Sequence, residues 1–413
     1  MTQPTSTTTP SSATTRRITP SAGRAWLIAA FAMAAVGWGA NQFAPLLSLY
    51  ETSRGVSTAQ GQGMFVLYAV GLVPGLLLGG PLSDRRGRRH IMLWALALSV
   101  AASVVLAVGA WTTVVLYAGR LIAGVASGAA FSCGTSWLGE LSAGSPGDAE
   151  RVPRRATVAM TAGFGLGPLA AGLLAQYAPA PLVAVYLPHI VLAAVALALA
   201  WRAPAPTPAA PAARAKGLGT PSWRHRRFLL LVLPVAPWVF LTGAVALATL
   251  PGSVGALLGD HLMLFTGLVT PLPALAGVLV QPLARRLRDR SRLLNVLSLA
   301  LAVVGLLVGA AAVHSTSIAL VVVGALVLGA AYGALMVSGL TEIQRLATPH
   351  HLGRTVAIFQ AAAYVGYLSP FFIALIARAV ALPHILVALA VLAGATAIWA
   401  AVIDGRLAHT VTR

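Results

Sequence analysis

Twelve apolar stretches, each about 20 residues long, constrain the fold of this chain more than any other feature of its sequence. About 20 apolar residues in a helix cross the hydrocarbon core of a bilayer. Hydrophobic residues make up 58% of the 413 residues and charged residues only 9%, whereas about a quarter of a soluble domain is charged. The sequence therefore predicts an all-α membrane protein with twelve spans. They lie near residues 25–49, 62–83, 91–110, 112–137, 156–177, 183–201, 228–250, 262–284, 293–313, 318–340, 355–377 and 385–403.

The basic residues predict how these spans are oriented. With the N-terminus inside, all 28 Lys and Arg except Arg54, Arg120 and Arg378 fall in tails or loops on the cytoplasmic side, as the positive-inside rule requires. Basic residues that bind nucleic acid would instead gather on one folded face with aromatic residues among them. We therefore expect a multi-pass protein of a bacterial plasma membrane, with both termini cytoplasmic and no nucleic-acid partner.

The chain divides into two halves of six spans. We expect a disordered tail at 1–24, a first bundle at 25–201, a Pro- and Arg-rich linker at 202–227, a second bundle at 228–403 and a short tail at 404–413. Shifting the second half by about 200 positions aligns Trp238 with Trp38 and Glu342 with Glu140. Internal repeats of this kind are typical of transporter folds, whose substrate site lies where the repeats meet.

The turn between the second and third spans, residues 80–89, reads Gly-Pro-Leu-Ser-Asp-Arg-Arg-Gly-Arg-Arg. It resembles the loop between helices 2 and 3 of the major facilitator superfamily, in which Gly, Asp and Arg recur at this spacing beside a gate. The resemblance covers about residues 25–403 and implies transport by alternating access. It assigns six charged residues to an inner gate. Four lie in the first half, Asp84, Arg85, Arg88 and Glu140, and two form a weaker counterpart in the second half, Arg286 and Glu342. Charges that only set topology and loop solubility are the alternative.

Arg120 lies within the fourth span, about 12 Å below the membrane surface. A guanidinium at this depth is expensive and usually marks a substrate or ion path. Gly124 and Gly128 follow at intervals of four on the same helical stripe and allow close helix approach. The superfamily often has an arginine at this place, above all in drug and proton antiporters. A snorkelling or internally paired arginine is the structural alternative.

The fifth span contains Gly-Phe-Gly-Leu-Gly-Pro-Leu-Ala-Ala-Gly at 163–172, which partly resembles the antiporter motif of the superfamily. Pro168 frees a backbone carbonyl and bends a helix, while small residues form a groove for another helix. The segment is therefore expected to act as a hinge between the halves, or simply as a tight packing surface. The residues concerned are Gly163, Gly167, Pro168 and Gly172.

Polar and aromatic residues at matching depths in both halves predict an amphipathic pocket. The fold implied by the resemblance places them around a central cavity, together with Arg120. Each alone is also consistent with an ordinary packing contact, but as a group they suit a mostly apolar ligand with a few hydrogen-bonding groups. They are Trp38, Asn41, Gln42, Trp238, Thr242, Tyr332, Gln360, Tyr364 and Tyr367.

The nine acidic residues all map to helix ends, loops or the tail, so no carboxylate is expected at mid-membrane. Glu51 and His189 are the candidate proton sites, because a carboxylate at an outer cavity and an imidazole can both titrate. A mechanism without proton coupling stays an alternative. Cys133 is the single cysteine, and no motif for a cofactor, metal or catalytic centre is recognised, so an enzyme is not expected.

We predict a monomeric secondary transporter that moves a small organic molecule through the lipid bilayer, most simply by proton-coupled efflux of drugs or metabolites. An uptake carrier for a sugar or organic acid is the alternative. A transporter-like membrane sensor, which binds a ligand without moving it, is a third possibility.

Overall fold

The computed structural model describes residues 24–109, 111–142, 148–204, 222–347 and 349–409. The described part of the chain is helical throughout and contains no strand, so the predicted all-α fold class is confirmed. Residues 1–23 of the predicted tail, most of the predicted linker at 202–227 and the end of the C-terminal tail lie outside the described residues.

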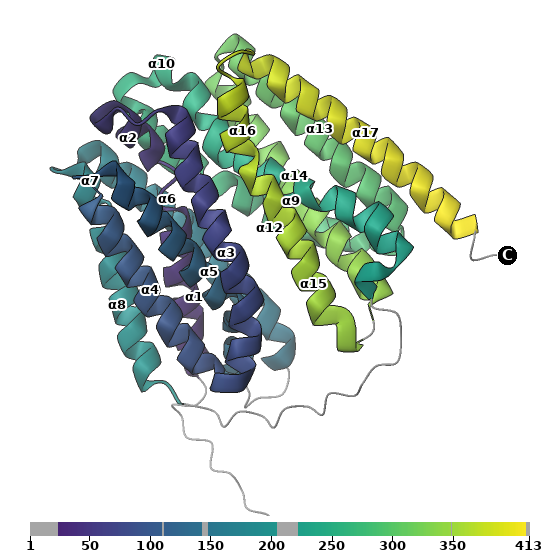
Figure 1. The fold of residues 1–413 in the computed structure, drawn as a ribbon, viewed down its shortest axis with the longest axis horizontal. Helices are drawn as coiled ribbons and strands as arrows, with labels where there is room; N and C mark the ends of the chain where they lie inside the picture. The colour runs from purple at the N-terminus through teal and green to yellow at the C-terminus, as the bar shows by residue number, and fades with distance from the viewer. Residues whose placement is uncertain (1–23, 110, 143–147, 205–221, 348, 410–413) are drawn as a thin grey trace, which may run out of the picture.

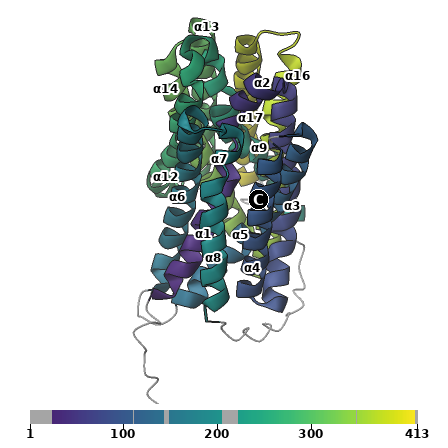
Figure 2. The same cartoon turned by 90° about the vertical axis from the view of Figure 1, so that its left-hand side faces the viewer.

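The first half contains six spans. Its helices are α1 (Trp26–Asn41), α2 (Leu46–Arg54), α3 (Thr58–Arg86), α4 (Arg88–Val108), α5 (Thr113–Ser142), α6 (Asp148–Tyr177), the short α7 (Pro181–Ala184) and α8 (Leu187–Arg202). The first span combines α1 and α2, which are separated by a turn ending at Pro45. α8 lies on the outside of this half, against α1 and α4 (Figure 2).

The second half repeats this plan with more interruptions. Its main elements are the π-helix η3 (Phe228–Val232), α9 (Leu233–Ala244), the π-helix η4 (Val245–Thr249), α11 (Leu262–Val269), α12 (Pro271–Arg286), α13 (Ser291–Ser315), α14 (Ile318–Leu346), α15 (Pro349–Tyr364), the 3-10 helix η7 (Val365–Leu368), α16 (Ser369–Ile376) and α17 (Leu382–His409). Three short pieces, η5 (Pro251–Val254), α10 (Gly255–Leu258) and η6 (Gly259–His261), connect η4 to α11.

Eleven helical stretches in the described residues are long and apolar enough to span a membrane. The sequence predicts twelve spans, and the difference has one cause. The stretch Phe228–Arg286 runs for 59 residues and contains both the expected span at 228–250 and the one at 262–284, because the helical pieces that connect them leave no extended loop.

The arginine-rich turn depends on one glycine. Gly87 separates α3 from α4 and has φ of 91°, a left-handed conformation that L residues with a side chain adopt only under strain. This turn ends the span beside Asp84 and starts the next at Arg88, so both charges lie at one end of the molecule. We call that end, which also carries Glu140, Glu342 and the described ends of the linker, the basic end.

Small residues bring the helices of each half into close contact in the same way. A Cβ atom added at Gly124 or Gly128 of α5 would clash with backbone carbonyl oxygens of α3. In the second half, a Cβ atom at Gly329 or Gly333 of α14 would clash with the backbone of α12. The second and fourth spans of each half therefore pack backbone against backbone, as small residues permit.

The two halves lie side by side (Figure 1). Contacts between them run along α3 with α15 and α16, and along α6 with α11 and α12. The turn between α3 and α4 lies at the lower end of Figure 1, and α2, α7 and α10 lie at the upper end, which we call the opposite end.

Candidate functional site

Arg120 lies in the interior of the first half, near the opposite end of α5. Its side chain is completely buried, so it does not snorkel to a membrane surface. Its Nε donates to the backbone carbonyl of Met64 at 3.4 Å, but Nη1 and Nη2 have no hydrogen-bond partner within the part of the chain that the structure describes. The alternative of an arginine paired with an acidic residue is also not met among the described side chains.

Aromatic rings surround this guanidinium. The Cζ atom of Arg120 lies 4.5 Å from the ring centre of Phe43, 4.5 Å from that of Tyr68 and 5.9 Å from that of Phe65. A desolvated cation over an aromatic face gains about 2 kcal/mol, which is less than the several kcal/mol that burial of an ion takes. The site therefore holds a positive charge that its surroundings stabilise only in part.

A chain of stacked rings leads from this site across the boundary between the halves. Phe65 of α3 stacks on Tyr367 of η7 with 5.0 Å between the ring centres. Tyr68 lies 6.5 Å from Tyr367. In the second half, Phe240 stacks on Tyr364 at 4.0 Å and lies 5.7 Å from Tyr332. We call this set the aromatic bridge, and its members are Phe65, Tyr68, Phe240, Tyr332, Tyr364 and Tyr367.

The aromatic bridge includes three of the predicted pocket residues, Tyr332, Tyr364 and Tyr367. Phe43, Phe65, Tyr68 and Phe240 are not among the residues predicted from the sequence. One signal was available: Phe65 and Tyr68 are three residues apart, a spacing that places two side chains on the same helical face, and Tyr364 and Tyr367 repeat it.

Other predicted pocket residues are directed elsewhere. Gln42 is buried and its Nε2 donates to Ser103 at 3.1 Å. The Trp238 indole donates to Thr396 of α17 at 3.2 Å, and the Thr242 hydroxyl donates to carbonyls of its own helix. These three side chains make contacts within their own half. The remaining three are half-buried at the ends of α1 and along α15: Trp38, Asn41 and Gln360.

His189 lies inside the first half, among α1, α4 and α8. Its Nε2 lies 3.1 Å from the Ala35 carbonyl, and its Nδ1 lies 2.7 Å from the Ser103 hydroxyl. Because a carbonyl only accepts, Nε2 carries the proton and donates it, and Nδ1 can accept from Ser103. The imidazole is therefore satisfied in its neutral form. Glu51, the other predicted proton site, is half-buried on α2 at the opposite end.

At the basic end of the first half, Arg88 holds two acidic residues. Its Nη1 lies 2.6 Å from Glu140 of α5, and its Nη2 lies 3.8 Å from Asp84. The Asp84 side chain is 71% exposed, and Arg85 is exposed beside it. These four residues of the predicted gate do gather, and the ion pairs described among them are made within the first half.

The second half has a corresponding cluster with a different arginine. Glu342, which is 1% exposed, pairs with Nε of Arg227 at 2.8 Å, and Asp404 pairs with Nη2 of Arg227 at 2.5 Å. Burial acts to lower the pKa of Arg227, but the hydrogen bond and charge of Glu342, with Asp404, outweigh it and raise the pKa. Arg286, the predicted counterpart, is exposed. Arg227, not Arg286, is the partner of Glu342. It can reach Glu342 because it lies at the start of the seventh span.

The repeat between the halves extends to a second contact at the basic end. The Arg155 guanidinium lies 4.1 Å from the ring centre of Trp26, and the Arg354 guanidinium lies 4.4 Å from that of Trp223. Arg354 follows Arg155 by 199 positions, close to the shift of about 200 that relates the two halves, so equivalent positions make equivalent contacts.

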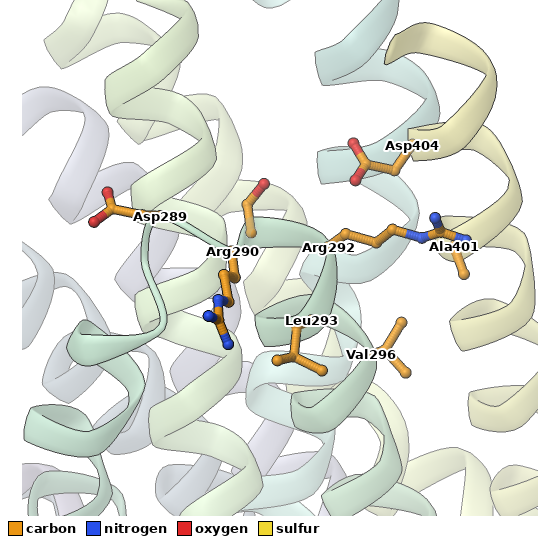
Figure 3. Close-up of a pocket in the computed structure, with 8 residues that line it drawn as sticks. Asp289, Arg290, Arg292, Leu293, Val296, Ala401 and Asp404 are labelled. Carbon is orange, nitrogen blue, oxygen red and sulfur yellow. The ribbon is translucent and has the colours of Figure 1, made fainter. Parts of the chain in front are cut away.

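A surface groove lies at the basic end between α13 and α17 (Figure 3). Arg290, Arg292, Leu293, Val296 and Asp404 are among the residues that line it. Its elements lie on the side of the second half away from α3 and α6, so the groove is separate from Arg120 and the aromatic bridge.

The small residues of α6 make two different contacts. A Cβ atom at Gly163 or Gly167 would clash with the backbone of α1 in the same half, whereas one at Gly172 would come within 2.8 Å of Gly267 of α11, in the other half. α6 continues through Pro168 without interruption. Breaks in regular helix lie elsewhere, among them the π-helix η4 and the 3-10 helix η7, and such segments inside a helix often mark hinges or functional sites.

Comparison with known proteins agrees with this architecture. Residues 26–367 match the family model described as the Major Facilitator Superfamily. The chain belongs to the Major Facilitator Superfamily. No curated protein matches the chain significantly in sequence.

Solved structures of superfamily transporters share the fold over nearly the whole chain. A POT family transporter, PepTSo, aligns with a TM-score of 0.75 and 14% identity, covering 93% of this chain and 98% of its own. A D-xylose–proton symporter aligns with a TM-score of 0.69 and 16% identity, covering 91% and 95%. A nucleoside transporter, NupG, aligns with a TM-score of 0.67 and 11% identity, covering 92% and 98%. This superfamily member is thus a multi-pass membrane protein with a transporter fold, and its superfamily is generally not enzymatic.

Proposed function

We propose that this superfamily member is a secondary active transporter that carries a small organic molecule by alternating access. One observation carries the proposal: the halves contact each other through side chains near the opposite end, while the ion pairs that the structure describes at the basic end are each made within one half. Gln62 of α3 donates to the Ala248 carbonyl at 3.0 Å, and the aromatic bridge crosses the boundary beside it. We infer from these contacts that the protein is closed at the opposite end in this structure.

In this mechanism the halves rock about the substrate site. Closing the basic end would require Asp84, which lies 3.8 Å from Arg88 of its own half, to gain a partner in the second half, and its carboxylate is 71% exposed. Partly solvated ion pairs suit such a latch because each is worth only about 0–1 kcal/mol and opens easily. The helix breaks at η4 and η7 lie beside the aromatic bridge and would absorb the change in angle.

The direction of transport and the coupling ion form the finer part of the proposal. The resemblance of 163–172 to the antiporter motif, with Arg120, favours proton-coupled efflux of drugs or metabolites from a bacterial cell, by a monomer with cytoplasmic termini. Glu51 is the preferred proton site, because His189 is hydrogen-bonded inside the first half. Uptake of a nutrient is the second candidate, and it has the same fold requirements.

Counterflow in proteoliposomes with an imposed pH gradient tests the proposal. A ligand is first found by thermal-shift screening of the purified protein, and its flux is then measured in both directions. Protons that move opposite to the ligand indicate efflux by exchange, and protons that move with it indicate uptake by symport. Binding without flux would overturn the transport proposal in favour of a sensor.

A further inference from the structure

We propose that Arg120 binds the carboxylate of the transported molecule, so that the substrate class is small organic anions with an apolar or aromatic body. This inference rests on the proposed transport function and narrows it. It starts from the two guanidinium nitrogens of Arg120 that are buried without a hydrogen-bond partner among the described residues.

The donor set suits a carboxylate. A guanidinium offers a planar fork that binds a carboxylate through two parallel hydrogen bonds. Nε of Arg120 is already occupied by the Met64 carbonyl, which leaves Nη1 and Nη2 as the pair that a ligand can take. An anion would supply the compensation that a buried cation requires.

The surroundings add neutral donors and apolar surface. The hydroxyls of Tyr50 and Tyr186 lie 2.8 Å apart, and Tyr50 stacks on Phe43, whose ring lies on the Arg120 guanidinium. Phenol hydroxyls can donate to an oxyanion, and the rings of Phe43 and Tyr68 on the guanidinium offer an apolar body a place to stack. The site carries a net positive charge, so it should exclude cationic molecules.

Access to this site depends on the conformation. Arg120 is completely buried in this structure, and on the side of the second half the rings of Phe65 and Tyr68 lie against Tyr367. Separation of the halves at the opposite end would part these rings. The carboxylate is therefore expected to bind the state in which the aromatic bridge is open.

Thermal-shift measurements on the full-length protein in detergent test the inference. The probes are benzoate, phenylacetate and 3-phenylpropionate, each compared with its own neutral amide. We expect at least one carboxylate to raise the unfolding temperature while its amide does not. Arg120→Gln should weaken that carboxylate at least tenfold, and Arg120→Lys, which keeps the charge, should retain part of the shift. Arg54→Gln, a change of the same charge at an exposed position of the opposite end, should behave like the wild type.

Two results would overturn the inference. In the first, no carboxylate shifts the unfolding temperature more than its amide does; in the second, the Arg120→Gln protein binds the carboxylate as tightly as the wild type does. If Arg120→Gln does not fold, the comparison of Arg120→Lys with Arg54→Gln decides, since only the former should change the affinity. Flux separates this inference from the proposed function. A carboxylate that binds through Arg120 without flux contradicts transport, whereas flux of a neutral solute without carboxylate binding contradicts the anion site.

Discussion

At the scale of single residues, Arg227 and Arg120 have two different kinds of surroundings. Arg227 is surrounded by acidic partners at the basic end, whereas Arg120 has aromatic rings and one backbone carbonyl. The first arrangement stabilises the fold. The second leaves a charge uncompensated, and residues of that kind are usually kept for a function that operates at the expense of stability.

Arg227→Gln is expected to destabilise the protein by about 3 kcal/mol, because it leaves the buried carboxylate of Glu342 without its arginine. Thermal unfolding in detergent measures the effect. Arg286→Gln serves as the control, since this exposed residue should change stability by about 0.5 kcal/mol or less. Equal effects of the two substitutions would contradict the assignment of Arg227 as the partner of Glu342.

Without ligand, the unfolding temperature of the Arg120→Met protein is expected to be at least as high as that of the wild type. The substitution loses about 2 kcal/mol of cation–π attraction and about 1 kcal/mol for one long hydrogen bond, but it removes a desolvation penalty of several kcal/mol. The same unfolding assay applies, with transport measured in parallel and expected to be lost. A large drop in unfolding temperature would assign Arg120 a structural role.

At the scale of elements, backbone contact between helices organises each half. Gly124 and Gly128 bring α5 onto α3, and Gly329 and Gly333 bring α14 onto α12. The sequence predicted the first of these contacts from its spacing. The second contact was not predicted, although Gly329 and Gly333 follow each other at the same interval of four, so the same signal was available in the second half.

Gly124→Ala is expected to destabilise the first half by about 1–3 kcal/mol, the range for overpacking, because the added methyl group would meet the Tyr68 carbonyl. Gly80→Ala is the matched control on α3: a Cβ atom there meets nothing within 4 Å, and alanine favours a helix by up to about 1 kcal/mol over glycine. Unfolding temperatures should therefore move in opposite directions. A tolerated Gly124→Ala would mean that the two helices separate at little expense.

At the scale of the whole molecule, the two halves meet near one end and carry their charge pairs at the other. Alternating access requires this asymmetry to reverse. Joining the halves at the opposite end should therefore stop transport, and removing a charge that the basic end needs for closure should slow it.

A cross-link between Gly63→Cys and Phe371→Cys, in a Cys133→Ser background, tests whether joining the halves at the opposite end stops transport. A Cβ atom at position 63 would lie 3.7 Å from the Phe371 ring, so a short thiol-reactive linker can connect α3 to α16. We expect flux to fall at least tenfold and to recover when the linker is removed by reduction. The background protein treated with the same linker is the control, and undiminished flux in the linked protein would exclude rocking of the halves.

Asp84→Asn tests whether removing a charge at the basic end slows transport. Asp84 is 71% exposed and 3.8 Å from Arg88, so its loss should leave the unfolding temperature of this state within about 0.5 kcal/mol of the wild type while reducing flux. Asp289→Asn, which removes an 87% exposed carboxylate at the same end of the second half, should leave flux unchanged. Normal flux in Asp84→Asn would remove this residue from the gate.

The sequence by itself determined the helical spans, the basic end and the place of Arg120 within its span, because hydropathy and charge act locally and a helix satisfies its own backbone in lipid. Only the tertiary structure decided that Arg227 is the partner of Glu342, that Gln42 and Trp238 are used within their own halves, and that Tyr367 stacks on Phe65. These contacts join residues far apart in the chain, so they depend on how close the helices approach and how each is rotated. Apolar spans carry little periodic signal for that rotation, since lipid and protein interior both accept the same side chains.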